Sequence, residues 1–295
     1  MPGIAQLTVL ILTAARCLAA GDATPYQPVP GAFGMTKWAA DITPGKVLPE
    51  YPRPLMVRKE WLNLNGLWDY RVASRSLAQP DFYQGKILVP FPIEAPLSGI
   101  GRMLNAMPDQ SYRDSRLWYR RYFEVPDGWK DRRTLLHFGA VDWEATVFLN
   151  GNMLGEHRGG YDGFSFDVTA ALIPNGRNEL IVAVWDPTSE GRYPCGKQIC
   201  KPGGIFYTPC TGIWQTAWLE PVAKAAAIRD LTLVPDIDHN LLRLTVATQP
   251  ENAEVRVRAI VMSRRASIWA STESGTCTAI WSPSKSALYA VQTNG

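Results

Sequence analysis

The residues from Ala145 to Gly151 constrain the fold more than any other segment of this sequence. Ala145-Thr146-Val147-Phe148-Leu149 is mostly apolar and β-branched, and alternate residues of such a run point to opposite faces of a strand. Asn150-Gly151 follows directly and favours the positive φ values that a two-residue hairpin turn requires. The pattern predicts an antiparallel hairpin whose return strand covers Met153 to His157.

Other short β-like runs are separated by turn signals, whereas helical periodicity is nearly absent. The run Leu180 to Trp185 is apolar on both faces, which predicts a central strand. In a last strand, Trp214, Thr216 and Trp218 are expected to share one face. These runs predict an all-β fold of antiparallel sheets packed face to face.

Composition excludes some partners. The 30 Lys and Arg residues nearly balance the 27 Asp and Glu residues, and no basic run is present, so we expect no nucleic acid partner. The 11 Trp and 11 Tyr residues suit stacking on the flat apolar face of a sugar. After the N-terminal run, no stretch approaches the ~18 apolar residues of a membrane span, so we expect no membrane partner.

The N-terminal region favours export. Ile4 to Ala20 is apolar and ends in small residues before Gly21, which predicts a signal peptide over residues 1–20 and a secreted or periplasmic protein. A buried N-terminal helix is the alternative. Residues 21–50 are rich in proline and glycine and predict an extended leader.

The cysteines favour a disulfide over a metal site. Export permits disulfides, and Cys195 could pair with Cys200 or Cys210 to close the loop they share. Neither a CxxC pair nor a neighbouring histidine supplies zinc ligands. We therefore expect no metal and no cofactor.

Seven pieces of the chain together resemble the sugar-binding domain of family 2 glycoside hydrolases, the β-galactosidase and β-glucuronidase family. In order, they are Asn65 to Trp68, Trp118 to Arg121, Phe138 to Asp142, Val147 to Gly151, Gly155 to Tyr161, Phe166 to Thr169 and Gly212 to Gln215. The resemblance implies a jelly-roll sandwich, followed by an immunoglobulin-like sandwich and a barrel whose two glutamates perform retaining hydrolysis.

The motif residues also have structural interpretations, which we favour. Asn150, Gly151, Gly159 and Gly160 suit chain reversals, and His157 suits a hydrogen-bonding strut. Tyr161, Gly212 and Trp214 are likewise counted as structural. Asp142 and Glu144 would lie on one side of a strand and could imitate the two carboxyls of a retaining glycosidase, but their place within the motif favours a structural role.

The resemblance points to one site residue. In galactosidases and glucuronidases of the family, an acidic residue five positions before a Ser/Ala-Gly-Ile motif contacts the sugar. Counting back from Thr211 in Thr211-Gly212-Ile213 reaches Phe206. An aromatic ring can stack on a pyranose, but it cannot accept hydrogen bonds from sugar hydroxyls as a carboxylate can. We therefore expect Phe206 and Tyr207 to face a β-glycoside, with a specificity that differs from the usual galactoside or glucuronide.

The resemblance and the strand pattern suggest a domain order. We expect a jelly roll over 51–221, the start of an immunoglobulin-like sandwich over 222–262, and an unassigned tail over 263–295 whose composition shifts to Ser, Thr, Ala and Trp. Such a sandwich takes about 100 residues, and a barrel takes about 250. The chain therefore predicts an N-terminal fragment of a glycosidase, partnered by a missing catalytic barrel and inactive alone. A free-standing carbohydrate-binding module and a structural sandwich without ligand are the alternatives.

Overall fold

The computed structural model describes residues 26–30, 35–53, 55–239 and 241–250, together with the strands that follow them. The predicted signal peptide, residues 1–20, lies outside the described residues. Helices of the described chain are all short 3₁₀ turns: η1 (Lys37–Asp41), η2 (Pro96–Ser98), η3 (Leu104–Ala106), η4 (Asp127–Trp129) and η5 (Thr188–Glu190). No helix in this part of the chain has the length and apolarity needed to cross a membrane.

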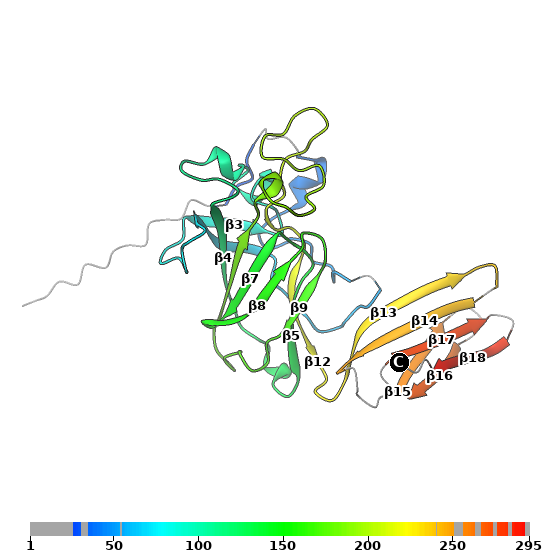
Figure 1. The fold of residues 1–295 in the computed structure, drawn as a ribbon. Coiled ribbons are helices and arrows are strands. Elements are labelled where there is room, and N and C mark those ends of the chain that lie inside the picture. The colour runs from blue at the N-terminus through cyan, green and yellow to red at the C-terminus, as the bar shows by residue number, and fades with distance from the viewer. Residues whose placement is uncertain are drawn as a thin grey trace, which may run out of the picture.

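Two antiparallel sheets form a sandwich (Figure 1). The six-stranded sheet has the order β3 (Gly85–Val89), β2 (Gly66–Ser74), β4 (Ser115–Phe123), β10 (Asn178–Trp185), β7 (Glu144–Leu149) and β8 (Asn152–Arg158). The four-stranded sheet has the order β1 (Leu62–Asn63), β12 (Ala217–Val222), β5 (Arg133–Phe138) and β9 (Phe164–Asp167). Beside them, β6 (Val141–Asp142) pairs with β11 (Gly212–Ile213).

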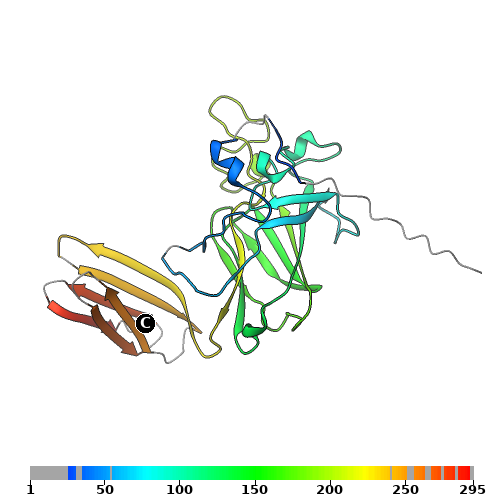
Figure 2. The same cartoon turned by 180° about the vertical axis from the view of Figure 1, so that it is seen from behind.

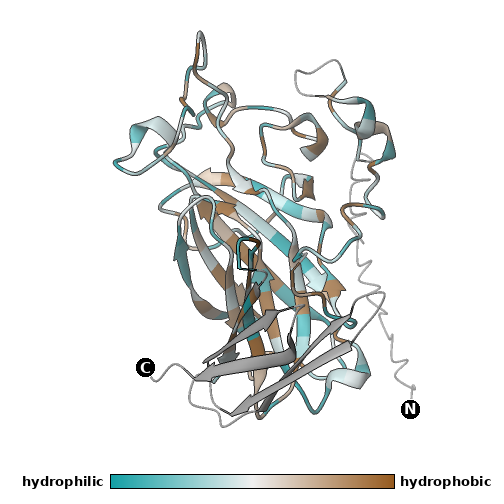
Figure 3. Ribbon diagram, turned by 90° about the vertical axis from the view of Figure 1, so that its right-hand side faces the viewer, coloured by the Kyte–Doolittle hydropathy of each residue, from teal (hydrophilic) through white to brown (hydrophobic). Residues whose placement is uncertain are grey.

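The core lies between these sheets, because alternate residues of each strand point inward. Trp68, Tyr119, Phe138, Val147 and Val182 are all fully buried members of one apolar cluster. Figure 3 shows hydrophobic residues along the middle of the sandwich strands. The prediction of an all-β sandwich is confirmed.

The sequence-based expectations for the central strands hold. Asn150 and Gly151 have φ values of 51° and 79° and join β7 to β8, as the Asn-Gly turn predicts. Strand β10 pairs with β4 on one side and with β7 on the other, so it is a central strand. Its apolar residues are buried on both faces. On the outer face of the sheet, Ile181 and Ala183 of β10 pack with Trp118 in a second apolar cluster.

The last strand differs from its prediction. Strand β12 begins only at Ala217, and a connector of residues 214–216 separates it from β11. Trp218 faces outward from the four-stranded sheet, while Trp214 belongs to the connector and is half-buried. The alternation predicted for Trp214, Thr216 and Trp218 therefore does not run through a single strand.

A buried ion cluster attaches residues 51–58 to the outer face of the four-stranded sheet. The Glu220 carboxylate accepts hydrogen bonds from Arg53 Nη2 at 2.5 and 2.6 Å, from Arg58 Nε at 2.9 Å and from the Tyr51 hydroxyl at 2.6 Å. Burial alone would raise the pKa of Glu220, but its hydrogen bonds with His137 and Arg53 outweigh burial and hold that pKa well below its usual range.

Beyond β12 the chain forms further sheets. Strands β13 (Ala227–Asp236), β14 (Leu241–Gln249), β17 (Thr276–Ser282) and β18 (Lys285–Gln292) make one sheet, and β15 (Arg256–Met262) pairs with β16 (Ser267–Glu273). The sequence analysis left residues 263–295 unassigned, because small residues and threonine there obscure any apolar alternation. These strands follow the end of the sandwich opposite to the loop of residues 186–211 (Figures 1 and 2).

Candidate functional site

The long loop of residues 186–211 lies at one end of the sandwich, together with β6, β11 and the turn of residues 159–163 (Figure 1). We call this region the loop end. The sequence-predicted residues Phe206 and Tyr207 lie here, as do Gly160, Tyr161, Gly212 and Trp214. Asn150 and Gly151 lie at the opposite end, because β7 runs the whole length of the sheet between Asp142 and Asn150.

Asp142 provides the central carboxyl of the loop end. It is only 6% exposed, and its Oδ2 accepts a hydrogen bond from Gln198 Nε2 at 3.2 Å. Burial, and then the nearby Asp186 carboxylate, raise the pKa of Asp142 to about 7. Gly160 packs directly against this carboxyl, since a Cβ at that position would lie 2.6 Å from Asp142 Oδ1.

Gln198 links Asp142 to the tip of the loop. Its Oε1 accepts a hydrogen bond from the Cys210 amide at 2.6 Å, while its Nε2 donates to Asp142. The backbone on either side of Gln198 pairs with Tyr207: the Tyr207 amide donates to Lys197 O at 2.8 Å, and the Ile199 amide donates to Tyr207 O at 3.1 Å. The position of Tyr207 is thus set by the same residue that contacts the carboxyl.

Two further carboxyls anchor the far end of the loop at Thr211. Glu94 Oε2 accepts the Thr211 amide at 2.9 Å, and Asp186 Oδ2 accepts the Thr211 hydroxyl at 2.6 Å. Asp186 also accepts a hydrogen bond from the Tyr193 hydroxyl at 2.8 Å. Burial raises the pKa of Glu94 to about 8. Within the described chain, Glu94, Asp142 and Asp186 have no ion-pair partner.

The tip of the loop is exposed. Phe206 exposes 45% of its surface and Tyr207 exposes 64%, and Tyr161 is also exposed on the neighbouring turn. The tip consists of aromatic side chains in solvent above a base of buried, hydrogen-bonded polar groups. An exposed ring suits stacking on a sugar, and a carboxyl beneath it suits a sugar hydroxyl.

Several sequence-predicted residues have structural environments. Asn150 Nδ2 donates to the Ala171 carbonyl at 2.8 Å, which fixes the hairpin turn. His157 stacks on Phe164 with ring centroids 4.1 Å apart, and burial lowers its pKa. Gly212 has a φ of 107°, and a Cβ there would lie 2.0 Å from the Tyr119 hydroxyl.

Cys195, Cys200 and Cys210 carry free thiols in the structure, so the expected disulfide is not formed. Cys200 is buried, and its Sγ accepts a hydrogen bond from the Ser189 hydroxyl at 3.5 Å. In the described part of the chain, no three His, Cys, Asp or Glu side chains are arranged to hold a metal ion.

Sequence reasoning predicted Phe206 and Tyr207 as site residues, and it gave no indication of the polar base to which their loop is bonded. Asp142 was noticed and given only a structural role within its motif. Glu94 lies 117 residues from Thr211 in the sequence, and no local pattern indicates that contact. Gln198 could have been suspected only from the polar residues between Cys195 and Cys200.

Comparison with known proteins agrees with this architecture. Residues 99–208 match the model of the family "Glycosyl hydrolases family 2, sugar binding domain". A β-galactosidase of Thermoanaerobacter pseudethanolicus is 31% identical over 140 residues, which are 47% of this chain and 18% of that protein. A β-glucuronidase of Paenibacillus borealis is 22% identical over 263 residues, which are 81% of this chain and 43% of that protein.

Solved structures resemble the fold. A β-glucuronidase of Lactobacillus rhamnosus superposes with a TM-score of 0.56 at 18% identity, covering 82% of this chain and 45% of that one. A β-glucuronidase of Ruminococcus gnavus in complex with D-glucuronic acid superposes with a TM-score of 0.55 at 16% identity, covering 82% of this chain and 46% of that one. The chain spans less than half the length of these relatives. Within it, residues 99–208 match the sugar binding domain of glycosyl hydrolases family 2.

Proposed function

We propose that this chain supplies the sugar-facing, non-catalytic part of a secreted family 2 β-glycosidase, and that its loop end contacts the glycone. The observation that carries the proposal is the connection from an exposed aromatic tip, through Gln198, to the Asp142 carboxyl. The ring of Phe206 can stack on a pyranose, and the Asp142 carboxylate can accept a hydrogen bond from a sugar hydroxyl. The apolar run before Gly21 supports export.

The charges of the loop end are of both signs and favour neither a neutral glycone nor a uronic acid. Burial raises the pKa of Glu94 to about 8 and that of Asp142 to about 7, which weakens the negative charge of the base near neutral pH. At the tip, Lys197 Nζ lies 5.7 Å from the centre of the Tyr207 ring and supplies a positive charge. We therefore propose both β-galactosides and β-glucuronides as ligands.

The described carboxyls of the loop end do not suit hydrolysis. A retaining glycosidase needs two carboxyls about 5 to 5.5 Å apart on either side of the scissile bond. Glu94 and Asp186 are buried, and both accept hydrogen bonds from Thr211. Glu144 accepts a hydrogen bond from Arg158 at 2.9 Å. The proposal therefore assigns the catalytic acid and nucleophile to other residues of the parent enzyme.

The proposal is tested by NMR titration of the 295-residue chain with methyl β-galactoside and methyl β-glucuronide. We expect dissociation constants in the millimolar range for both sugars. Phe206→Ala should weaken binding about fivefold, because one aromatic contact contributes about 1 kcal/mol. Ile205→Ala is the matched control, since this neighbouring side chain is 69% exposed and offers no ring.

Two results would contradict the proposal. Equal binding by the Phe206→Ala and wild-type chains would show that the tip does not contact the sugar. Hydrolysis of aryl β-glycosides by the purified chain, if Asp142→Asn abolishes it, would show that the chain carries its own catalytic machinery.

A further inference from the structure

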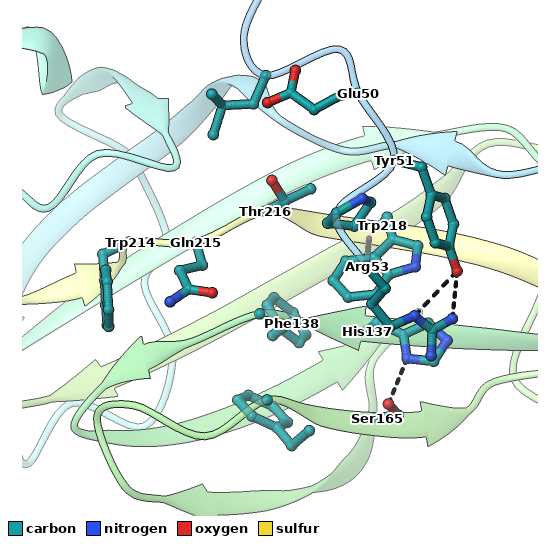
Figure 4. Close-up of a pocket in the computed structure, with 15 residues that line it drawn as sticks. Glu50, Tyr51, Arg53, His137, Phe138, Ser165, Trp214, Gln215, Thr216 and Trp218 are labelled. Carbon is teal, nitrogen blue, oxygen red and sulfur yellow. Dashed lines mark hydrogen bonds between the residues drawn. The ribbon is translucent and has the colours of Figure 1, made fainter. Parts of the chain in front are cut away.

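A cavity of about 610 Å³ lies on the outer face of the four-stranded sheet (Figure 4). Its walls come from residues 48–53 where the leader ends, from the adjoining ends of β5 and β9, and from the connector of residues 214–216. Phe206 and Tyr207 do not line it. The volume falls within the range of about 300 to 1,000 Å³ typical of small-molecule sites.

Trp214 provides the available aromatic surface of this cavity. Phe164 is stacked between His157 and Phe138, and Trp218 is covered by the stacked ring of His137. The described ring neighbour of Trp214 is Tyr161, which meets it edge to face. The indole is also held in place, since its Nε1 donates to the Gly160 carbonyl at 2.7 Å. A fixed, half-buried indole is a suitable platform for a sugar ring.

Polar groups without protein partners lie around this platform. Gln215 follows Trp214 in the connector, and Glu50 comes from the leader (Figure 4). Both side chains are exposed, and neither takes part in a hydrogen bond or ion pair within the described chain. An amide can both donate and accept, and a carboxylate accepts two hydrogen bonds. Together they match neighbouring hydroxyls on a sugar.

The charges around the cavity balance. Arg53 lines it and shares the single carboxylate of Glu220 with Arg58, which leaves one positive charge in that cluster. Burial lowers the pKa of His137, which favours its neutral form. The negative charge of Glu50 offsets the excess positive charge of the cluster, so that hydrogen bonding and stacking carry recognition in this cavity.

We propose that this cavity is a second carbohydrate site, which binds hexopyranose units of a glycan chain. Trp214 stacks on one pyranose ring, and Gln215 and Glu50 bind hydroxyls of the same chain. The cavity adjoins the loop end at Trp214, so it would hold a further part of a polymeric substrate beside the glycone and raise its local concentration.

The test is an NMR titration of the full chain with lactose and cellobiose, followed at the indole N–H signal of Trp214. Trp214→Phe identifies that signal. We expect both sugars to shift it, with dissociation constants in the millimolar range. Gln215→Ala and Glu50→Ala should each weaken binding about fivefold, because each removes hydrogen bonds of about 1 kcal/mol. Glu124→Ala is the matched control, since Glu124 is exposed on the strand end beyond β4.

The two sugar sites are distinguished by their variants. Phe206→Ala should leave the lactose-induced shift of Trp214 unchanged, even if the loop-end proposal fails. An absent shift, or a shift unaffected by both Gln215→Ala and Glu50→Ala, would overturn the cavity proposal.

Discussion

Replacing Glu94 by glutamine should remove much of the decrease in stability that this fold undergoes as the pH rises. The pKa of Glu94 is raised from 4.5 to about 8 because the carboxyl is buried. A raised carboxyl pKa stabilises the fold fully below its unfolded value near 4.5, and this contribution is lost as the pH rises through about 8. A shift of about 3.5 pKa units corresponds to about 5 kcal/mol of unfolding free energy.

Glutamine preserves the local contacts of Glu94 while removing its ionisation. The remaining amide oxygen can accept the Thr211 amide, which now lies 2.9 Å from Glu94 Oε2, and the amide nitrogen can donate to the Tyr112 hydroxyl. The two proteins should therefore have similar stability at about pH 5, and Glu94→Gln should be the more stable by about 5 kcal/mol well above about pH 8.

Urea unfolding followed by tryptophan fluorescence at several pH values measures this difference. Glu124→Gln, at an exposed position, serves as the control and should follow the wild-type profile. Parallel stability profiles for wild type and Glu94→Gln between about pH 5 and about pH 9 would refute the reasoning, because they would show that Glu94 ionises in the fold as easily as in the unfolded chain.

Two further predictions concern stability. Glu220→Gln should lower the unfolding free energy by about 3 to 5 kcal/mol, measured by urea unfolding at neutral pH, because it leaves the Arg53 and Arg58 guanidiniums without their buried partner; an unchanged midpoint would contradict this. Gly160→Ala should lower the melting temperature, because the new Cβ meets the Asp142 carboxyl, whereas Gly203→Ala, with nothing within 4 Å, should not; equal melting temperatures would show that the turn relaxes freely.

The sequence predicts the strands of the sandwich because their signals are local. Asn150-Gly151 encodes its own turn, and Leu180 to Trp185 shows its central position by being apolar on both faces. Phe206 was predicted as a site residue by its spacing from Thr211, not by any property of its neighbours. Local pattern was sufficient for the fold, and the role of the aromatic tip stays a prediction.

The remaining features depend on contacts between distant residues. Glu94 and Thr211, or Glu50 and Trp214, come together only when the whole sandwich has formed. The sequence around each of them has no feature that distinguishes a buried carboxyl from a solvated one. The burial of Trp118 likewise depends on Ala73 of β2 and Ile181 of β10, which pack with it in the second apolar cluster.

The separation of the loop into a bonded base and an exposed tip has an evolutionary consequence. Gln198 and Thr211 hold the base, whereas Ile205, Phe206 and Tyr207 project into solvent, and Gly203 and Gly204 have no neighbour that a side chain would meet. Exposed positions of this kind tolerate substitution with little effect on folding. The tip can therefore diversify while the scaffold is inherited unchanged, so that new substrate preferences arise without first compromising the fold.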